Sequence, residues 1–124
     1  MTKLKAPKLK VSKAYKIKVT PTFKLSLSRQ ISFLSHKYSA KKARANKYFL
    51  YEKIKKELTA KPNIAPVSQR LLGLGIANYR QWSVDKHNII FYRINNDSAD
   101  VTLLLAMDAR QDIQKLLYEL MLLD

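Results

Sequence analysis

The sequence of 124 residues has no cysteine and only two glycines. Without cysteine, neither a disulfide framework nor a thiolate metal site can form. The two histidines, His36 and His87, have no partners at metal-ligand spacing, so we expect no metal. Gly73 and Gly75 do not fit the pattern of a phosphate-binding loop. We therefore expect no small-molecule cofactor.

Long apolar runs are also missing. No run approaches the roughly 20 residues that a membrane-spanning helix needs, and the N-terminus is basic without the apolar segment of a secretory signal. These features predict a cytoplasmic protein without a membrane role. The length allows one domain with a sizeable core. Residues 1–14 are rich in lysine and contain no acid, so we expect a basic flexible tail before a single domain at 15–124.

Acidic residues are scarce in the first half of the chain. Residues 1–61 contain 18 Lys or Arg against only Glu52 and Glu57, a net charge of +16. Residues 62–124 contain 6 against 7, a net charge of −1. This asymmetry predicts a polyanionic partner: nucleic acid, an anionic membrane surface or an acidic protein segment. The membrane surface is the weakest of the three, because the basic helices need their apolar faces for the core.

The first half of the domain predicts one strand and a pair of helices. Residues 15–20 (YKIKVT) alternate apolar and polar side chains, as a half-buried strand does. In residues 20–38, apolar residues recur every three or four positions along one helical face, with Thr20 as the expected cap and Pro21 at the first helical position. Ser39 is the expected cap of a second helix over 40–58 that ends before Pro62.

The second half predicts three strands and a last helix. The strands are expected at 76–84, 87–95 and 101–107, and the helix over 110–123. The run VTLLLAM is almost entirely apolar, which suits a strand covered on both faces. The predicted fold class is α+β, with an antiparallel sheet, an N-terminal helical hairpin packed on it and a short C-terminal helix.

Arg110 follows the last predicted strand, in the stretch LLLAMDARQDI. Asp108 and Gln111 have the spacing of a capping box, which makes Asp108 the expected cap of the last helix. Arg110 would then lie in the first helical turn, where the helix dipole mildly opposes a positive charge. The residue therefore suits either a partner contact or an ordinary surface arginine.

Four further side chains are candidates for a functional surface. Arg80 and Trp82 alternate along one strand and share a face, and Arg93 lies on the next strand. Together they could hold RNA by charge and stacking, although a lone tryptophan is more often a buried anchor. His87 could act as an acid or base but has no evident carboxylate partner in the sequence.

The motifs NYRQW, HNIIFYRI and LLAMDARQDI, in this order and spacing, resemble the C-terminal half of the RelE/ParE toxins of type II toxin–antitoxin modules. The resemblance covers roughly residues 15–122. It implies a small basic toxin that is neutralised by the acidic, partly disordered segment of a cognate antitoxin. Such segments usually wrap the helices and sheet of the toxin, which fits a polycationic hairpin.

The two branches of this superfamily act differently. The resemblance to RelE implies a ribosome-dependent endoribonuclease that cuts mRNA, whereas ParE-like members inhibit DNA gyrase without catalysis. The RelE pattern has basic residues at the positions of Arg80, Trp82, Ile89 and Arg110, and a tyrosine at Leu116. Of these positions, only Arg80 and Arg110 keep a positive charge. Cleavage of RNA at a site without a proton-transfer group should be much slower.

The segments FYRI and MDARQD are more similar to the ParE branch. The sequence therefore favours a gyrase inhibitor without catalytic residues. Contacts to the target or the antitoxin are expected from Arg80, Trp82, Arg93 and Arg110. The first alternative is a ribonuclease acting on mRNA at the ribosome, with Arg80, His87 and Arg110 as candidate catalytic residues. The second is a basic nucleic-acid-binding protein with no toxic activity.

Overall fold

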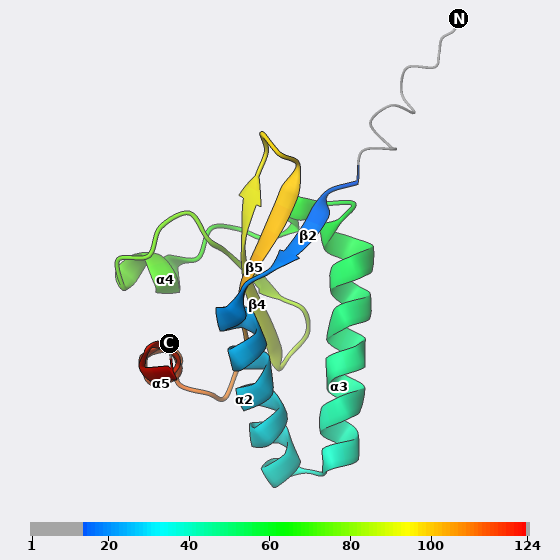
Figure 1. Ribbon diagram of the computed structural model, residues 1–124, viewed down its shortest axis with the longest axis vertical. Helices are drawn as coiled ribbons and strands as arrows, with labels where there is room; N and C mark the ends of the chain where they lie inside the picture. Colours follow the sequence, from blue (N-terminus) through cyan, green and yellow to red (C-terminus); the bar gives the residue numbers. More distant parts are fainter. Residues whose placement is uncertain (1–13, 124) are drawn as a thin grey trace, which may run out of the picture.

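The computed structural model describes residues 14–123, with side chains described as far as Leu120. Figure 1 shows a sheet with a helical hairpin and further helices around it. The elements follow in the order β2 (Lys16–Val19), α2 (Pro21–Lys37), α3 (Ala40–Lys53), the π-helical turn η1 (Ile54–Leu58), the 3-10 turn η2 (Pro62–Ile64), α4 (Gln69–Gly73), β3 (Arg80–Ser83), β4 (Asn88–Asn95), β5 (Asp100–Asp108) and α5 (Ile113–Leu123). The tail predicted at 1–14 lies almost wholly outside the described residues.

The four strands form one mixed sheet in the order β2-β5-β4-β3. The pairs β3–β4 and β4–β5 are antiparallel, as expected. The pair β2–β5 is parallel, so the predicted sheet is not antiparallel throughout. The reason is that β2 and β5 are not consecutive in the sequence. The helical hairpin and the strands β3 and β4 lie between them, so no tight turn forces β2 and β5 to run in opposite directions. The α+β class is confirmed.

Both predicted caps of the hairpin are confirmed. The Thr20 hydroxyl accepts a hydrogen bond from the Phe23 N–H at 3.0 Å and donates one to the Leu103 carbonyl at 2.8 Å. Ser39 accepts from the Lys42 N–H at 3.1 Å. Thr20 therefore begins α2 and also ties it to β5, whereas Ser39 only begins α3.

Each face of the sheet has its own apolar cluster. On the hairpin face, Phe23, Leu27, Leu50, Ile54 and Leu58 pack against Ile90, Tyr92, Val101, Leu103 and Ala106. On the opposite face, Leu71, Leu116 and Leu120 of α4 and α5 pack against Ile89, Phe91, Leu105 and Met107. β5, the strand predicted to be covered on both faces, is therefore covered by the hairpin on one face and by α4 and α5 on the other.

A β-bulge in β5 adjusts the alternation of its side chains. Phe91 pairs with Leu105 and Tyr92 with Leu103, so Leu104 is the extra residue. Leu103 faces the hairpin, whereas Leu105 faces α5. Without the bulge, these two leucines would share one face.

Two local predictions are wrong. No helix is predicted between the segments 40–58 and 76–84, but α4 lies there and buries Leu71 completely. Asp108 does not cap the last helix. The cap is Asp112, whose carboxylate accepts from the N–H groups of Gln114 and Lys115 at 2.9 and 3.2 Å. Arg110 therefore lies in a turn before α5.

Candidate functional site

The structure distributes the side chains singled out in the sequence among three cavities. His87 and Arg110 line one cavity, Arg80 and Arg93 line a second, and Trp82 lines a third. Arg80 pairs with Tyr92 of β4, whereas His87 precedes Asn88, where β4 begins. Five residues of strand separate the two places, roughly 16 Å at about 3.3 Å per residue. Arg80 and Arg110 thus belong to opposite ends of the sheet.

The cavity with His87 and Arg110, which we name the Arg110 pocket, has a volume of about 380 Å³. It lies where the hairpin meets the end of β5 and the start of β4. It is lined by side chains from both helices and both strand ends: Leu34, Tyr38, Lys42, Asn46, Asp85, His87, Asn88, Asp108 and Arg110. Most of these residues carry a polar or charged group, and charges of both signs are present.

Arg110 is held by two side chains of this pocket. Its Nε and Nη2 donate to the two carboxylate oxygens of Asp108 at 2.7 and 2.8 Å, and its Nη1 donates to the Tyr38 hydroxyl at 2.7 Å. The guanidinium also lies 5.6 Å from the centre of the Tyr38 ring and 5.8 Å from that of Phe33. This fork geometry fixes the direction of the guanidinium.

These contacts shift the titration of all three groups. Burial raises the pKa of Asp108, but the hydrogen bonds from the side chain and backbone of Arg110 outweigh it and hold that pKa below its usual value. The hydrogen bond from Arg110 lowers the pKa of the Tyr38 phenol. In turn, Asp108 and then Tyr38 raise the pKa of Arg110. At neutral pH the cluster contains a charged arginine and a charged aspartate.

Asn88 is the centre of a second network in the same pocket. It is buried, and its carbonyl oxygen accepts from Gln30 at 2.9 Å and from Asn46 at 3.1 Å. Its amide nitrogen donates to Asn46 at 2.9 Å and to both carboxylate oxygens of Asp85 at 3.1 and 3.2 Å. The network joins α2, α3 and the turn before β4. It therefore keeps the floor of the pocket rigid.

Lys42 supplies a second cation of the pocket, and His87 supplies an imidazole ring. The Lys42 ammonium lies 5.5 Å from the centre of the Tyr38 ring. The His87 backbone N–H donates to Asp85 at 2.9 Å, and the residue is exposed. With Arg110, these groups could hold a carboxylate or a phosphate. Asp85 and Asp108 face the same space, so the pocket also offers acceptors to a cation or an amide.

At the other end of the sheet, Arg80 and Arg93 line a cavity of about 590 Å³. The Arg80 Nη1 donates to the Ala65 carbonyl at 2.6 Å, so this arginine supports the connection after η2. The Arg93 guanidinium lies 5.7 Å from the centre of the Tyr79 ring. The cavity therefore presents two guanidinium groups, whereas Trp82, the aromatic residue expected to share a surface with them, lines a different cavity.

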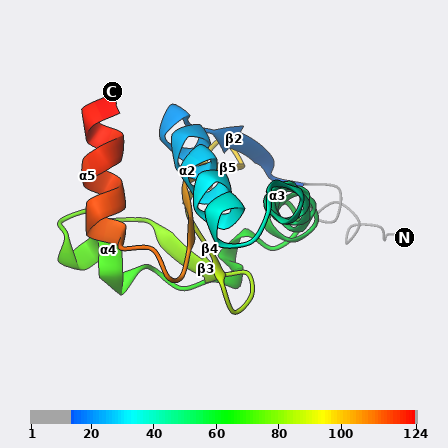
Figure 2. The same cartoon turned by 90° about the horizontal axis from the view of Figure 1, so that it is seen from below.

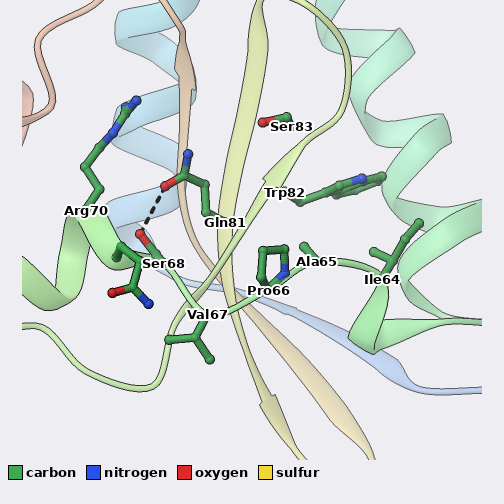
Figure 3. A pocket seen from close by; sticks show the side chains of 10 residues that line it. Ile64, Ala65, Pro66, Val67, Ser68, Arg70, Gln81, Trp82 and Ser83 are labelled. Atoms are coloured by element: carbon green, nitrogen blue, oxygen red, sulfur yellow. Dashed lines mark hydrogen bonds between the residues drawn. The ribbon is translucent and has the colours of Figure 1, made fainter.

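Trp82 lies in the third and largest cavity, of about 900 Å³, between the connection 64–70 and β3 (Figure 3). The Ser68 hydroxyl donates to the Gln81 side-chain oxygen at 3.1 Å across it. Trp82 itself is only 7% exposed and packs in the hairpin-face cluster. Its ring is an anchor of the core that borders the cavity.

The fold is similar to that of chains in two solved toxin–antitoxin structures. One is the crystal structure of the toxin-antitoxin complex RelBE2 from Mycobacterium tuberculosis, with a TM-score of 0.53 at 19% identity, over 77% of this chain and 98% of that chain. The other is the chromosomal ParDE TA system from P. aeruginosa, with a TM-score of 0.61 at 14% identity, over 78% of this chain and 98% of that chain. The chain has the RelE/ParE toxin fold. No protein-family model and no curated protein matches the sequence.

Within this RelE/ParE fold, the positions of the ribonuclease pattern can be located. Trp82, Ile89 and Leu116 are 7%, 5% and 3% exposed, and all three belong to apolar clusters. Arg80 and Arg110 are the two positions that keep a charge, and each makes hydrogen bonds within the chain. The five positions therefore do not form one open basic surface.

Three residues that build the Arg110 pocket have no direct signal in the sequence. Tyr38 is only the last residue of the predicted helical segment 20–38, but it is 50% exposed and accepts a hydrogen bond from Arg110. Asn88 falls within the strand predicted at 87–95, and Asp85 falls between that strand and the one predicted at 76–84. One signal is present: an asparagine at the start of a long apolar strand needs buried hydrogen-bond partners if the strand is covered. No helix in the described part of the chain is long and apolar enough to cross a membrane.

Proposed function

We propose that this protein is the toxin of a type II toxin–antitoxin module, acting in the cytoplasm as a non-catalytic, ParE-like inhibitor of DNA gyrase. The observation that carries the proposal is the burial of Trp82, Ile89 and Leu116 within a RelE/ParE fold. A ribonuclease of the RelE type needs cations and a proton-transfer group at these positions. Apolar side chains in the core can supply neither.

The location of the two remaining arginines supports the same proposal. Arg80 and Arg110 belong to opposite ends of the sheet and line different cavities. One scissile phosphate cannot touch both, because stabilisation of a transition state needs donors about 3 Å from the same atom. Each arginine can instead contact a different part of a large protein partner. The ParDE chain also gives the higher TM-score of the two neighbours.

An acidic antitoxin is the second partner that we propose. Both neighbouring structures belong to toxin–antitoxin systems. Residues 1–61 of this chain have a net charge of +16, so an acidic segment would be attracted over much of its surface. Arg80, Arg93 and Arg110 are the contacts that we assign to the target or to this antitoxin. Trp82, the fourth contact expected from the sequence, is 7% exposed and serves the core instead.

Gyrase supercoiling of relaxed plasmid, with the purified chain titrated in at fixed salt, tests the proposal. We expect loss of supercoiling near one toxin per gyrase subunit, and Arg110→Ala should weaken it. Arg70→Ala is the matched control, because Arg70 is an exposed arginine away from the Arg110 pocket. Topoisomerase IV tests selectivity. Unchanged supercoiling by a folded wild-type protein would exclude gyrase as the target.

One observation favours a ribonuclease as the second candidate. His87 and Arg110 line the same cavity, with Asp85 and Asp108 beside them, and a histidine near carboxylates could move the 2′-OH proton. Cleavage of mRNA during translation in vitro distinguishes this function. If cuts appear and His87→Ala removes them while Arg80→Ala does not, the Arg110 pocket is an active site.

A further inference from the structure

The cavity of about 590 Å³ with Arg80 and Arg93, which we name the sheet-end cavity, is lined mainly by residues with polar side chains. It lies where β3 begins and β4 approaches its turn with β5. Figure 1 shows this turn at the upper end of the described chain and the turn between α2 and α3 at the lower end. Two guanidinium groups against one carboxylate leave the lining net positive, which favours an anionic ligand. The other polar residues of the lining are three asparagines and this one acid: Asn78, Asn95, Asn96 and Asp97.

The two arginines reach the sheet-end cavity from opposite faces of the sheet. Arg80 pairs with Tyr92, whose side chain packs in the hairpin-face cluster, so Arg80 lies on that face. Arg93 is the next residue of β4 and lies on the other face, where its guanidinium is 5.7 Å from the centre of the Tyr79 ring. Both side chains line one cavity because it lies at the edge of the sheet, where β3 begins. A ligand in it is therefore met by guanidinium groups from two directions.

The charges of Arg80 and Arg93 are not compensated by the fold. In the described part of the chain, neither arginine forms an ion pair with an acid. Asp100, on the strand next to Arg93, is buried and pairs with Lys18 at 3.3 Å instead. The bond from the Arg80 Nη1 to the Ala65 carbonyl fixes this side chain but uses only one of its donors. Both guanidinium groups therefore keep N–H donors for a ligand.

The backbone of β4 adds a further donor at the sheet-end cavity. Arg80 pairs with Tyr92, and the Gln81 N–H donates away from β4, to the connection before α4 at 2.9 Å. Backbone N–H groups alternate in direction along a strand, so those of Tyr92 and Ile94 point towards the β3 side. β3 begins at Arg80, because Asn78 has a φ of 70° in the left-handed region, so Ile94 has no partner on this strand. Ile94 lines the cavity, which places its N–H beside the arginines.

We propose that the sheet-end cavity binds a phosphate of a nucleic-acid backbone. Arginine, asparagine and backbone N–H groups are the usual donors to such phosphates. A tetrahedral phosphate presents oxygens in several directions and can meet both guanidinium groups, whereas a planar carboxylate is matched by the fork of one arginine. The described residues of the lining include no aromatic ring for base stacking, so we expect binding without sequence preference. The inference narrows the contacts assigned to Arg80 and Arg93, and it does not depend on gyrase as the target.

Proton–nitrogen correlation spectra of the full chain test the site directly. Inorganic phosphate should shift the Ile94 amide and the Nε resonances of Arg80 and Arg93 saturably. Dimethyl phosphate, which carries the charge of one backbone diester, should shift the same resonances more weakly. Acetate at equal ionic strength is the control for carboxylates. Phosphate shifts that do not include these three resonances would overturn the inference, as would equal shifts by acetate, which would assign the cavity to an acidic protein segment.

The binding of a fluorescent DNA duplex, measured by anisotropy at several salt concentrations, tests the nucleic acid. Arg80→Gln with Arg93→Gln should weaken binding about 10-fold and lower the salt slope by about 0.9, the value for one phosphate of B-DNA. Arg44→Gln with Arg70→Gln is the matched control, because it removes the same charge from exposed arginines of α3 and α4. These helices lie on opposite sides of α2 (Figures 1 and 2). Equal weakening by the two pairs would overturn the inference, since only net charge would then matter.

Two single variants keep the test independent of folding. Arg93 is exposed, so Arg93→Gln should keep the wild-type melting temperature and still weaken duplex binding more than Arg70→Gln does. Asp97→Asn removes the one acid of the lining and should strengthen duplex binding about 2- to 5-fold, whereas Glu52→Gln on α3 should have a smaller effect. Unchanged or weaker binding by Asp97→Asn would contradict a phosphate in this cavity.

Discussion

The guanidinium of Arg110 forms two parallel hydrogen bonds with the carboxylate of Asp108, at 2.7 and 2.8 Å. The Asp108 side chain is only 1% exposed, whereas that of Arg110 is 31% exposed. The pair thus joins a buried anion to a half-exposed cation at the end of β5. Arg110 therefore has a structural partner, and any contact with a target must use the part of its guanidinium that remains open to solvent.

Removal of this arginine should change how stability depends on pH. The pKa of Asp108 lies below its usual 3.8 because Arg110 outweighs the effect of burial. In the wild type, ionised Asp108 therefore contributes stability above about pH 4, and this is lost as pH falls through the lowered pKa. In Arg110→Ala, burial acts with less opposition and the pKa rises. The urea midpoints of the two proteins should differ most at neutral pH and converge on acidification. A difference between the two urea midpoints that stays constant down to pH 3 would contradict this role of Asp108.

Tyr38 should ionise at a lower pH than Tyr92. The hydrogen bond from Arg110 lowers its pKa, whereas burial raises that of Tyr92. Ultraviolet difference absorption should therefore show an early phenolate phase in the wild type that is absent in both Tyr38→Phe and Arg110→Ala. Tyr118→Phe is a suitable control, because this exposed ring lies on α5. An early phase that persists in Tyr38→Phe would assign it to another ring.

The Asn88 network should be costly to interrupt. Asn88→Ala leaves Gln30 and Asn46 without the acceptor that they share and removes two hydrogen bonds to Asp85. Unpaired buried polar groups cost about 1–3 kcal/mol each, so we expect a loss of about 2–4 kcal/mol in the free energy of unfolding. Urea denaturation measures it, and Asn63→Ala at an exposed position gives the baseline. A loss equal to that of Asn63→Ala would show that water replaces the network.

The two caps of the hairpin should differ in strength. Thr20 caps α2 and also donates to the Leu103 carbonyl, whereas Ser39 only caps α3 at an exposed site. Thr20→Ala should therefore lower the free energy of unfolding by about 2 kcal/mol and Ser39→Ala by about 1 kcal/mol or less. Thermal unfolding of the two variants side by side measures this difference. The reverse order would mean that the bond to Leu103 contributes nothing.

The sequence predicted the features that depend on periodicity and caps. The hairpin, the three last strands and the caps at Thr20 and Ser39 all follow from patterns within about 20 residues. What it missed depends on contacts between distant segments. The parallel pairing of β2 with β5, the bulge at Leu104 and the bond between Tyr38 and Arg110 each join residues from different parts of the chain. Of the site, the sequence identified Arg110 and His87 but not the side chains that hold them.

The last prediction tests whether a ribonuclease surface could exist on this chain at all. Ile89 occupies a position where the ribonuclease pattern has a basic residue, yet it is 5% exposed and packs with Leu105 and Met107. Ile89→Arg would place a charge in this cluster without an acid beside it, which should cost several kcal/mol. We therefore expect Ile89→Arg to be unfolded or strongly destabilised in urea.

Arg93→Ala and Ile94→Arg are controls for that variant, because Arg93 is exposed and Ile94 is only half-buried on the same strand. Both should lose less stability than Ile89→Arg. If Ile89→Arg instead folds with near-wild-type stability, this face opens readily to water. If that variant also cleaves mRNA, the result would favour the ribonuclease over the gyrase inhibitor. The wild type would then lack only one positive charge for catalysis, and the apolar core would not prevent it.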